Sequence, residues 1–311
     1  MATTGWIDAE SFDGHTNGPG HPERPERLEA IRDALGRVSY GSRLVRTQAT
    51  PVDLDLVRRI HDPSYVAQVE ATCKTGGFLD PDTGVGPASW PAALDAAGAM
   101  VQAVNEVLTG TWQRAFCSVR PPGHHATPDR AMGFCLFDNV AIGAQAALDH
   151  PDIEKVAIID WDVHHGNGTQ DIFWRRGDVL FASTHQFPMY PGTGAHDETG
   201  EGAGEGTTVN CPLPAGAGDP EILQAWRETI RPAVEAFAPD IILISAGFDA
   251  DARDPLARME VTAGGFETLS SEVIALADQL CGGRVVSILE GGYSLEALGE
   301  DVRIHVDTLT S

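Results

Sequence analysis

Short apolar runs separated by longer amphipathic segments recur along the chain and predict strands that alternate with helices. Residues 156–159 (Val-Ala-Ile-Ile) and 241–244 (Ile-Ile-Leu-Ile) contain no polar position, which is typical of strands buried on both faces of a parallel sheet. Leu28, Ile31 and Leu35 instead recur at the spacing of one helix face. The alternation predicts an α/β fold with a central parallel sheet flanked by helices on both faces.

Turn and cap residues set the limits of the expected elements. Strands are expected over residues 6–8, 115–119, 156–159, 179–184, 207–211, 285–289 and from 241 toward 249. Helices are expected to begin at Pro25, at 50–51 and at 62–63, and to cover 89–109, the residues through 142–148, 169–174, 220–237, 264–280 and the C-terminal residues. Segments 75–89 and 194–206 are rich in Gly with Pro, Asp or Glu and predict loops. At 311 residues the chain can form a single domain, 1–311.

Polar side chains follow four of the predicted strands at the point where each strand ends. They are His124 and His125, then Asp162 and His164, then Asp249, and last Tyr293. In an open parallel sheet the ligand site lies outside the carboxyl ends of the strands, so these side chains are expected to converge. Each group alone would indicate only a strand that ends in a polar loop. Their convergence favours a functional site.

Two carboxylates and one imidazole in this set have the composition of a zinc site. Asp160, Asp162 and His164 are spaced by two, so an extended chain can aim them to one side. Asp162 and His164 with Asp249 supply three protein ligands of the oxygen and nitrogen types that zinc accepts. A catalytic zinc keeps its fourth position open for water, whose pKa it lowers toward about 7.

The remaining polar residues match the proton transfers that amide hydrolysis requires. His124 or His125 could take a proton from water while the other, protonated, gives one to the departing amine. Asp160 and Asn167 are placed to orient these imidazoles. Tyr293, in a Gly-Gly-Tyr turn, could donate its hydroxyl to the oxyanion. The residues therefore predict metal-assisted hydrolysis of an amide.

Charge and cysteine content narrow the classes of partner. The formal net charge of -24 argues against nucleic acid bound through its phosphates, and it favours cationic substrates such as lysine-bearing peptides or polyamines. The five cysteines are scattered without a Cys-x-x-Cys pair, which disfavours a disulfide framework and a thiolate zinc site. The sequence shows neither a leader-like start nor a run of membrane-spanning length, so a cytoplasmic protein without a membrane partner is expected.

Five motifs in order resemble those of zinc-dependent histone deacetylases, especially class II enzymes and bacterial histone deacetylase-like amidohydrolases. They begin at residues 120 (Arg-Pro-Pro-Gly-His-His-Ala), 160 (Asp-Trp-Asp-Val-His-His-Gly-Asn-Gly-Thr-Gln), 190 (Tyr-Pro-Gly-Thr-Gly), 245 (Ser-Ala-Gly-Phe-Asp) and 290 (Glu-Gly-Gly-Tyr). The resemblance covers essentially the whole chain. It implies the arginase-deacetylase fold, with a central parallel sheet of about eight strands.

The resemblance also implies roles for individual residues. It implies zinc ligands at Asp162, His164 and Asp249, a general base at His124, a general acid at His125 and an oxyanion donor at Tyr293. It implies a substrate channel with walls at Phe134 and Tyr190, a floor at Gly133, a rim residue at Asp82 and an arginine at an internal exit cavity, Arg27. It implies potassium bound by Asp160, Asp162, His164, Ser183 and Thr184, and a second potassium bound by Phe173, Arg176 and Val179.

Several positions bear on the choice among related activities. Tyr190 stands where phenylalanine is usual, and Asn167 stands where class I enzymes carry aspartate. Leu256 stands where polyamine deacetylases resemble one another in carrying a glutamate, which favours an acylated lysine peptide or a similar small acylated amine over acetylpolyamine. Gly166 stands where an arginase-type two-manganese site would need a carboxylate. Two alternative functions stay open: a small-molecule amide or ester hydrolase, and a non-catalytic acyl-binding or scaffold protein. The sequence also leaves open whether the protein forms a homo-oligomer.

Overall fold

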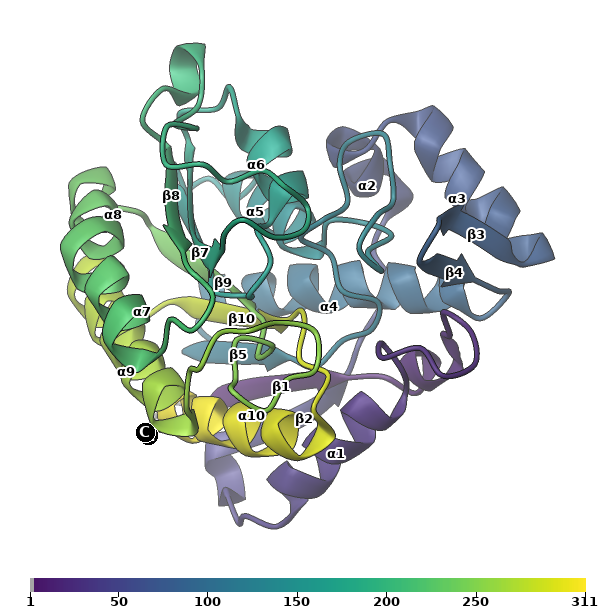
Figure 1. The fold of residues 1–311 in the computed structure, drawn as a ribbon, viewed down its shortest axis with the longest axis horizontal. Coiled ribbons are helices and arrows are strands. Elements are labelled where there is room, and N and C mark those ends of the chain that lie inside the picture. Colours follow the sequence, from purple (N-terminus) through teal and green to yellow (C-terminus); the bar gives the residue numbers. More distant parts are fainter. Residues whose placement is uncertain (1–2) are drawn as a thin grey trace.

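The computed structural model describes residues 3–311, and in this part of the chain eight parallel strands form one sheet (Figure 1). The strands lie in the order β2-β1-β5-β10-β9-β6-β7-β8. Their bounds in that order are Leu44–Gln48, Thr4–Asp8, Arg114–Cys117, Val285–Leu289, Ile241–Ala246, Val156–Asp160, Val179–Gln186 and Thr208–Leu213. The predicted α/β class and the parallel sheet of about eight strands are confirmed.

The four central strands are those that carry the polar residues at their ends. Every residue of β5, β10, β9 and β6 is buried. Val156 of β6 pairs with Ile241 of β9, and Val285 of β10 pairs with Ile242 of β9, so these strands run in step. Their carboxyl ends therefore meet at one edge of the sheet, and the loops that follow lie side by side.

Helices cover both faces of this sheet (Figure 1). On one face α1 (Glu26–Gly36) packs on α10 (Leu295–Leu309), which packs on α9 (Ala263–Leu280). On the other, α4 (Ser89–Leu108) packs on α5 (Asn139–Leu148). The remaining helices are α2 (Leu54–Ile60), α3 (Pro63–Thr75), α6 (Asn167–Phe173), α7 (Asp219–Ala225) and α8 (Arg231–Phe237). Within residues 3–311 none of the helices is long and apolar enough to cross a membrane.

Proline or a side-chain cap marks the starts of α2, α3 and α5, and one predicted start is displaced. α3 begins at Pro63 as predicted. α5 begins after Asp138, whose carboxylate accepts from the N–H of Ala141 at 2.9 Å. α2 begins at Leu54 rather than at 50–51, because Asp53 is the residue whose side chain caps it. The dipeptide Thr50-Pro51 lies in the preceding connection.

Three features differ from the expected elements. The edge strand β2 was not predicted, because its residues are half-buried or exposed and form no continuous apolar run. Segment 75–89 is not only a loop: it contains an antiparallel hairpin of β3 (Gly77–Asp80) and β4 (Thr83–Val85). A π-helical turn, Trp226–Ile230, joins α7 to α8, where Pro232 lacks the N–H that would continue an α-helical ladder.

Candidate metal centre and active site

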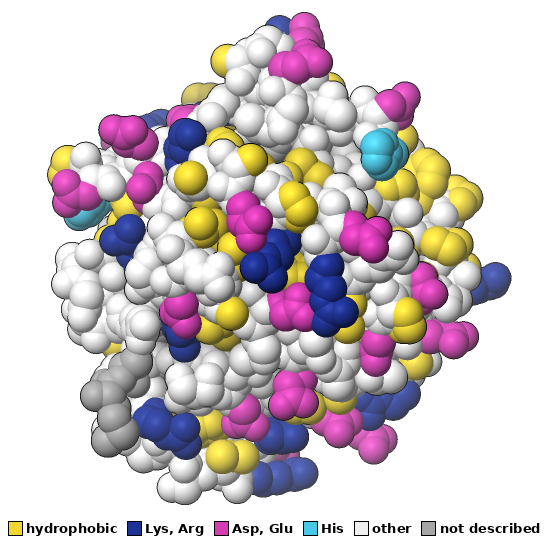
Figure 2. Space-filling view, turned by 90° about the vertical axis from the view of Figure 1, so that its left-hand side faces the viewer, with side chains coloured by type: hydrophobic (Ala, Val, Ile, Leu, Met, Phe, Trp, Pro, Cys, Tyr) yellow, Lys and Arg dark blue, Asp and Glu magenta, His cyan; other side chains and the backbone are white. Residues whose placement is uncertain are grey.

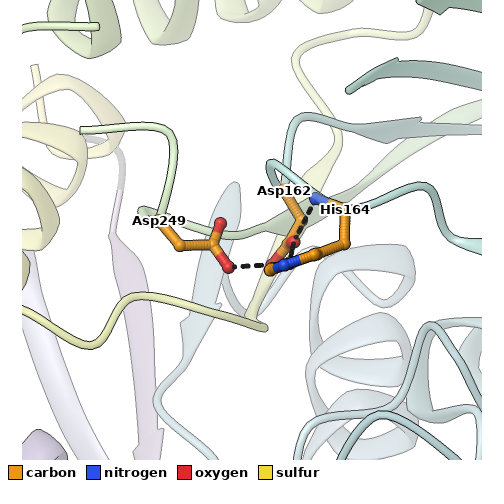
Figure 3. Close-up of side chains that lie close together, drawn as sticks. All are labelled: Asp162, His164 and Asp249. Atoms are coloured by element: carbon orange, nitrogen blue, oxygen red, sulfur yellow. Dashed lines mark hydrogen bonds and ion pairs between the residues drawn. The ribbon is translucent and has the colours of Figure 1, made fainter. Parts of the chain in front are cut away.

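The three predicted metal ligands lie together at the carboxyl ends of adjacent strands (Figure 3). Asp162 and His164 follow β6, and Asp249 follows β9. One ligand atom from each residue lies within 4.8 Å of the other two. Nδ1 of His164 is 3.2 Å from Oδ1 of Asp162 and 3.2 Å from Oδ2 of Asp249. Segments 85 residues apart in the sequence thus meet at one point.

The donor set fits a zinc ion. Oδ2 of Asp249 is buried, and apart from the facing His164 ring it has no polar partner among residues 3–311. The other oxygen of Asp249 accepts from the N–H of Val163 at 2.9 Å, which fixes the carboxylate with Oδ2 free. A Cβ at Gly291 would lie 2.0 Å from this oxygen, so glycine keeps the space beside it open. Two carboxylates and an imidazole aimed at one point suit a tetrahedral site with an open position.

The electrostatics of the cluster favour a positive charge at its centre. Burial alone would lower the pKa of His164, but its bonds to Asp162 and Asp249 outweigh burial and raise the pKa to about 10. The carboxylates therefore attract a cation to the position that Nδ1 faces, either a proton on the ring or a metal ion bound by it. A zinc ion satisfies the same two carboxylates.

Two adjacent histidines face this cluster from the loop after β5. Nδ1 of His124 lies 2.9 Å from Oδ2 of Asp160, and Nδ1 of His125 lies 2.8 Å from Oδ1 of Asn167. Both contacts were expected from the sequence. Nε2 of His124 is 3.8 Å from Oδ1 of the metal ligand Asp162, so this ring points its free nitrogen toward the metal centre.

The surroundings of the two histidines separate their pKa values. Burial lowers both, but Asp160, Asp162 and Glu290 outweigh it and raise the pKa of His124 well above its usual range. Burial and the neighbouring imidazoles hold the pKa of His125 well below its usual range. The charges of the chain alone therefore favour a proton on His124 and a neutral His125, the reverse of the roles that the resemblance implies. The charge of a zinc ion beside Asp162 acts on His124 in the opposite sense.

Glu290 is a buried residue that the sequence interpretation did not assign. Its Oε2 accepts from the N–H of Gly123 at 2.7 Å and from that of His124 at 3.2 Å, so it holds the histidine loop. Its Oε1 is buried without a partner in the described part of the chain, and burial raises its pKa to about 8. A signal existed: Glu290 directly follows a buried strand, β10, as Asp249 follows the buried strand β9 three residues after its end.

Tyr293 lies in a turn that several backbone contacts hold in place. Gly291 donates its N–H to Oδ2 of Asp162 at 2.7 Å. Arg27 is fully buried and donates to the carbonyls of Gly292 and Glu290 at 2.6 Å each, with its guanidinium 4.9 Å from the Tyr293 ring. Arg27 thus binds the tyrosine turn, and its implied role at an exit cavity stays a prediction.

The residues implied as channel walls and floor lie beside His125 or Tyr293. The Tyr190 ring lies edge-on to that of His125, with 5.2 Å between centroids, and the Phe134 ring lies edge-on to that of Tyr293 at 6.0 Å. A Cβ at Gly133 would lie 2.3 Å from Cδ2 of His125, and Gly133 has φ +56°. Glycine is therefore required here both for space and for its backbone conformation. The structure therefore brings these side chains together.

The implied rim residues lie on loops next to the channel. Asp82 is exposed in the turn between β3 and β4, and the adjacent Thr83 hydroxyl accepts from the N–H of Phe134 at 3.1 Å. His21 packs edge-on against the Phe134 ring, with 4.5 Å between centroids. Leu256 donates its N–H to Asp254, which also binds the N–H of Tyr293.

The residues implied for potassium form two groups. Ser183 and Thr184 lie on β7 beside the end of β6, where Asp160 pairs with Ser183. The hydroxyl of Thr184 is buried without a hydrogen-bond partner in the described chain. The second group, Phe173, Arg176 and Val179, lies in the connection from α6 to β7, where the N–H of Arg176 already binds the carbonyl of Phe173 at 2.9 Å. Potassium binding stays a prediction.

Comparisons with known proteins match nearly the whole chain. The histone deacetylase domain family matches residues 21–309. A probable deacetylase of Archaeoglobus fulgidus is 42% identical over 295 residues, which cover 94% of this chain and 82% of the relative. A histone deacetylase-like amidohydrolase of Pseudomonas aeruginosa is 40% identical over 292 residues, which cover 93% and 75%. The crystal structure of the HDA15 HD domain matches with a TM-score of 0.94 at 36% identity, over 100% of this chain and 90% of that one.

Proposed function

Because the chain belongs to the histone deacetylase family and has the arginase-deacetylase fold, we propose that it is a zinc-dependent deacetylase that removes acetyl or related acyl groups from lysine side chains or similar amines. One observation carries this proposal. Asp162, His164 and Asp249 aim one ligand atom each at a common point, His124 and His125 lie beside it, and Tyr293 follows the neighbouring strand β10.

Zinc held by these three ligands would lower the pKa of a water molecule and polarise the acyl carbonyl. Asp160 and Asn167 orient His124 and His125 through Nδ1, which leaves each Nε2 for proton transfer. The neutral imidazole accepts the proton of the attacking water, and the protonated one gives a proton to the leaving amine. The pair acts as one unit with coupled pKa values, one ring neutral and one protonated.

Tyr293 and the channel residues act on the acyl group. The Tyr293 hydroxyl would donate to the carbonyl oxygen as that oxygen gains charge, a contact typically worth about 3 kcal/mol of transition-state stabilisation. Phe134 and Tyr190 present apolar ring surface that suits the methylene stem of an acylated lysine. Leu256 provides no carboxylate for a second ammonium group, which favours an acyl-lysine peptide over an acetylpolyamine. Bound potassium and a cytoplasmic location complete the proposal.

A substrate panel tests this function. Acetyl-lysine peptides, acetylated spermidine and simple acetylated anilides would be offered to zinc-loaded protein and to Tyr293→Phe. The proposal expects the acetyl-lysine peptide to be preferred and kcat to fall about 100-fold in the variant, because one oxyanion donor is lost. Equal turnover of acetylated spermidine would overturn the substrate assignment. No hydrolysis of any member by zinc-loaded protein would overturn the activity and favour an acyl-binding protein.

A further inference from the structure

A buried carboxylate outside the metal cluster joins two loops of the active site. Asp254 lies in the connection between β9 and α9 and is 8% exposed. Its Oδ2 accepts from the N–H of Tyr293 at 2.6 Å and from that of Ser294 at 3.2 Å. Its Oδ1 accepts from the N–H of Leu256 at 2.9 Å. Three backbone N–H groups from two segments thus converge on one side chain.

The two segments carry different parts of the proposed site. Tyr293 is the oxyanion donor, and Ser294 begins α10, so the bonds to Oδ2 fix where the tyrosine turn meets its helix. Leu256 is the residue that stands at the substrate-selecting position. Since the two oxygens of one carboxylate hold their N–H groups, Leu256 and Tyr293 lie side by side at a fixed separation.

Other contacts shape the rest of this connection without reaching Tyr293. Arg253 binds the carboxylate of Asp251 at 2.8 Å and that of Glu300 on α10 at 2.8 Å. The N–H of Ala252 binds the carbonyl of Val261 at 3.0 Å. These contacts hold the ends of the connection, whereas Asp254 holds its middle against the tyrosine turn. Losing one carboxylate oxygen would leave a buried N–H without a partner and free the two segments to shift.

We propose that Asp254 is a positioning residue that fixes Tyr293 relative to Leu256, and that it sets both the rate of the enzyme and its preference between acyl-lysine and acetylpolyamine substrates. This inference rests on the proposed function. Asp254 touches neither the metal ligands through the bonds described nor the acyl group, so it acts only through the two residues that it holds. A small displacement of an oxyanion donor is enough to slow an enzyme strongly.

The first test replaces Asp254 with asparagine. Asp254→Asn keeps the size of the side chain, but one of its two terminal atoms becomes an NH2 donor that cannot accept from an N–H. We expect kcat for an acetyl-lysine peptide to fall about 10- to 100-fold, with KM changed less than about threefold. The ratio of kcat/KM between an acetyl-lysine peptide and acetylated spermidine should shift by about threefold or more. Glu300→Gln is the matched control, because it removes only the charge of the exposed contact with Arg253 and should leave all these values unchanged.

A double-variant cycle separates positioning from general destabilisation. If Asp254 acts through Tyr293, Asp254→Asn should have little further effect on kcat in a Tyr293→Phe background. An equal fold-loss in both backgrounds, an unchanged kcat or an unchanged ratio between acetyl-lysine peptide and acetylated spermidine would overturn the inference. Asp254→Glu is the second variant, since it keeps the charge but moves the carboxylate by one methylene. If both variants fail to fold, the carboxylate serves folding and the inference is overturned.

A binding measurement tests the inference without relying on turnover. A short alkyl hydroxamate can chelate zinc and accept a hydrogen bond from the Tyr293 hydroxyl, and its Kd can be measured by calorimetry on zinc-loaded protein. We expect Asp254→Asn to raise this Kd about fivefold or more, and to leave it unchanged in the Tyr293→Phe background. Zinc affinity should be the same in all variants. If the wild type binds the hydroxamate but hydrolyses no acyl-lysine, only the proposed function is overturned. If the Kd of Asp254→Asn is unchanged, only the positioning role of Asp254 is overturned.

Discussion

At the scale of single residues, each group placed to do chemistry is held by a second side chain behind it. Asp160 and Asn167 orient the two histidine rings, Glu290 holds their loop, and Asp254 holds the turn of the tyrosine. All of these supporting residues are buried. Their bonds are strong because they are shielded from water, and each unmade bond would leave a buried polar group unpaired.

Glu290 supports the first prediction. Glu290→Ala should lower kcat about 100-fold, because the N–H groups of Gly123 and His124 lose their acceptor and the histidine loop shifts. Glu290→Gln keeps an acceptor oxygen of the same reach and should retain kcat within about tenfold of the wild type. Steady-state kinetics and bound zinc would be measured for both. A Gln variant as impaired as the Ala variant would show that the charge of Glu290, and not its acceptor oxygen, is what the site needs.

The residues that could be predicted are those whose function depends on chemical type and place along a strand. Asp162 and His164 come two and four residues after the buried strand β6, and Asp160, which contacts His124, is its last residue. Asp254 could not be predicted, because it binds backbone N–H groups up to 40 residues away. Every residue other than proline has a backbone N–H, so the sequence does not indicate which one a side chain will bind. The roles of His124 and His125 depend on charges gathered by the whole fold, which residue types alone do not reveal.

At the scale of elements, the turns after the strands determine how closely the strands' polar ends approach. The turn between β10 and α10 brings Gly291 against both carboxylate ligands. A Cβ there would lie 2.0 Å from Oδ2 of Asp249 and 2.6 Å from Oδ2 of Asp162. The turn is therefore part of the proposed metal site although it supplies no ligand.

Gly291→Ala should accordingly abolish zinc binding and hydrolysis while the fold is retained. The added methyl group would displace one carboxylate from the common point that the three ligands share. Zinc affinity would be measured by competition with a chromophoric chelator, and melting temperature would be recorded alongside. Gly36→Ala is the control, because a Cβ at Gly36 meets nothing within 4 Å. Normal zinc affinity in Gly291→Ala would contradict the account of this turn.

The packing of α10 on β10 contains a buried histidine that makes stability depend on pH. Nδ1 of His305 lies 2.8 Å from the hydroxyl of Ser270, and Nε2 lies 2.8 Å from that of Ser287. The ring is fully buried, and burial lowers its pKa to about 3. Below pH ~6.5 the unfolded chain binds a proton at this ring and the folded chain does not, so stability is present above pH ~6.5 and is lost as pH falls toward 3.

We therefore expect the wild type to lose stability relative to His305→Gln as pH is lowered. Between pH 7 and pH 5 the unfolding free energy of the wild type should fall by about 2 kcal/mol more than that of the variant. Urea denaturation at several pH values, followed by circular dichroism, would measure it. Parallel stability curves for the two proteins would contradict the lowered pKa of His305.

Elements buried on both faces were predicted well, and partly exposed ones were not. The runs that became β6 and β9 have no polar position and so were recognisable. The edge strand β2 and the hairpin strand β3 are half-buried or exposed, and β4, although buried, is only three residues long, so none of them forms a continuous apolar run. The hairpin matters because Thr83 holds the backbone of Phe134, a contact that links an unpredicted element to the channel.

At the scale of the whole molecule, the order of the strands determines which segments form the site. β5 and β10 are neighbours although Arg114 of β5 pairs with Val285 of β10, 171 residues further along the chain, and no local pattern encodes that pairing. Alternation of strands and helices predicted a parallel sheet, and the motifs placed the functional residues in it. The order of the strands across the sheet could not be predicted and is seen only in the structure.

The net charge of -24 leads to a prediction about substrate encounter. Acidic and basic side chains are interspersed over the face in Figure 2, so the excess of negative charge acts as a general field. Asp80 and Asp82 add exposed or half-buried carboxylates on the hairpin beside the channel. At low salt, an acetyl-lysine peptide flanked by arginines should have a kcat/KM about tenfold higher than an acetyl-lysine peptide flanked by glutamates. In about 0.5 M salt, this ratio of kcat/KM values should fall to about twofold. A ratio that does not change with salt would exclude this steering.

The most direct test of the central claim is a zinc titration of chelator-stripped protein, with bound metal and acetyl-lysine hydrolysis measured on the same samples. Because Asp162, His164 and Asp249 form one three-ligand site, activity should rise in proportion to bound zinc and reach its plateau at one ion per chain. Asp249→Ala should bind zinc at least about 100-fold more weakly and show no activity at that ratio. A plateau at two ions per chain, hydrolysis without zinc, or unchanged zinc binding in Asp249→Ala would contradict the account.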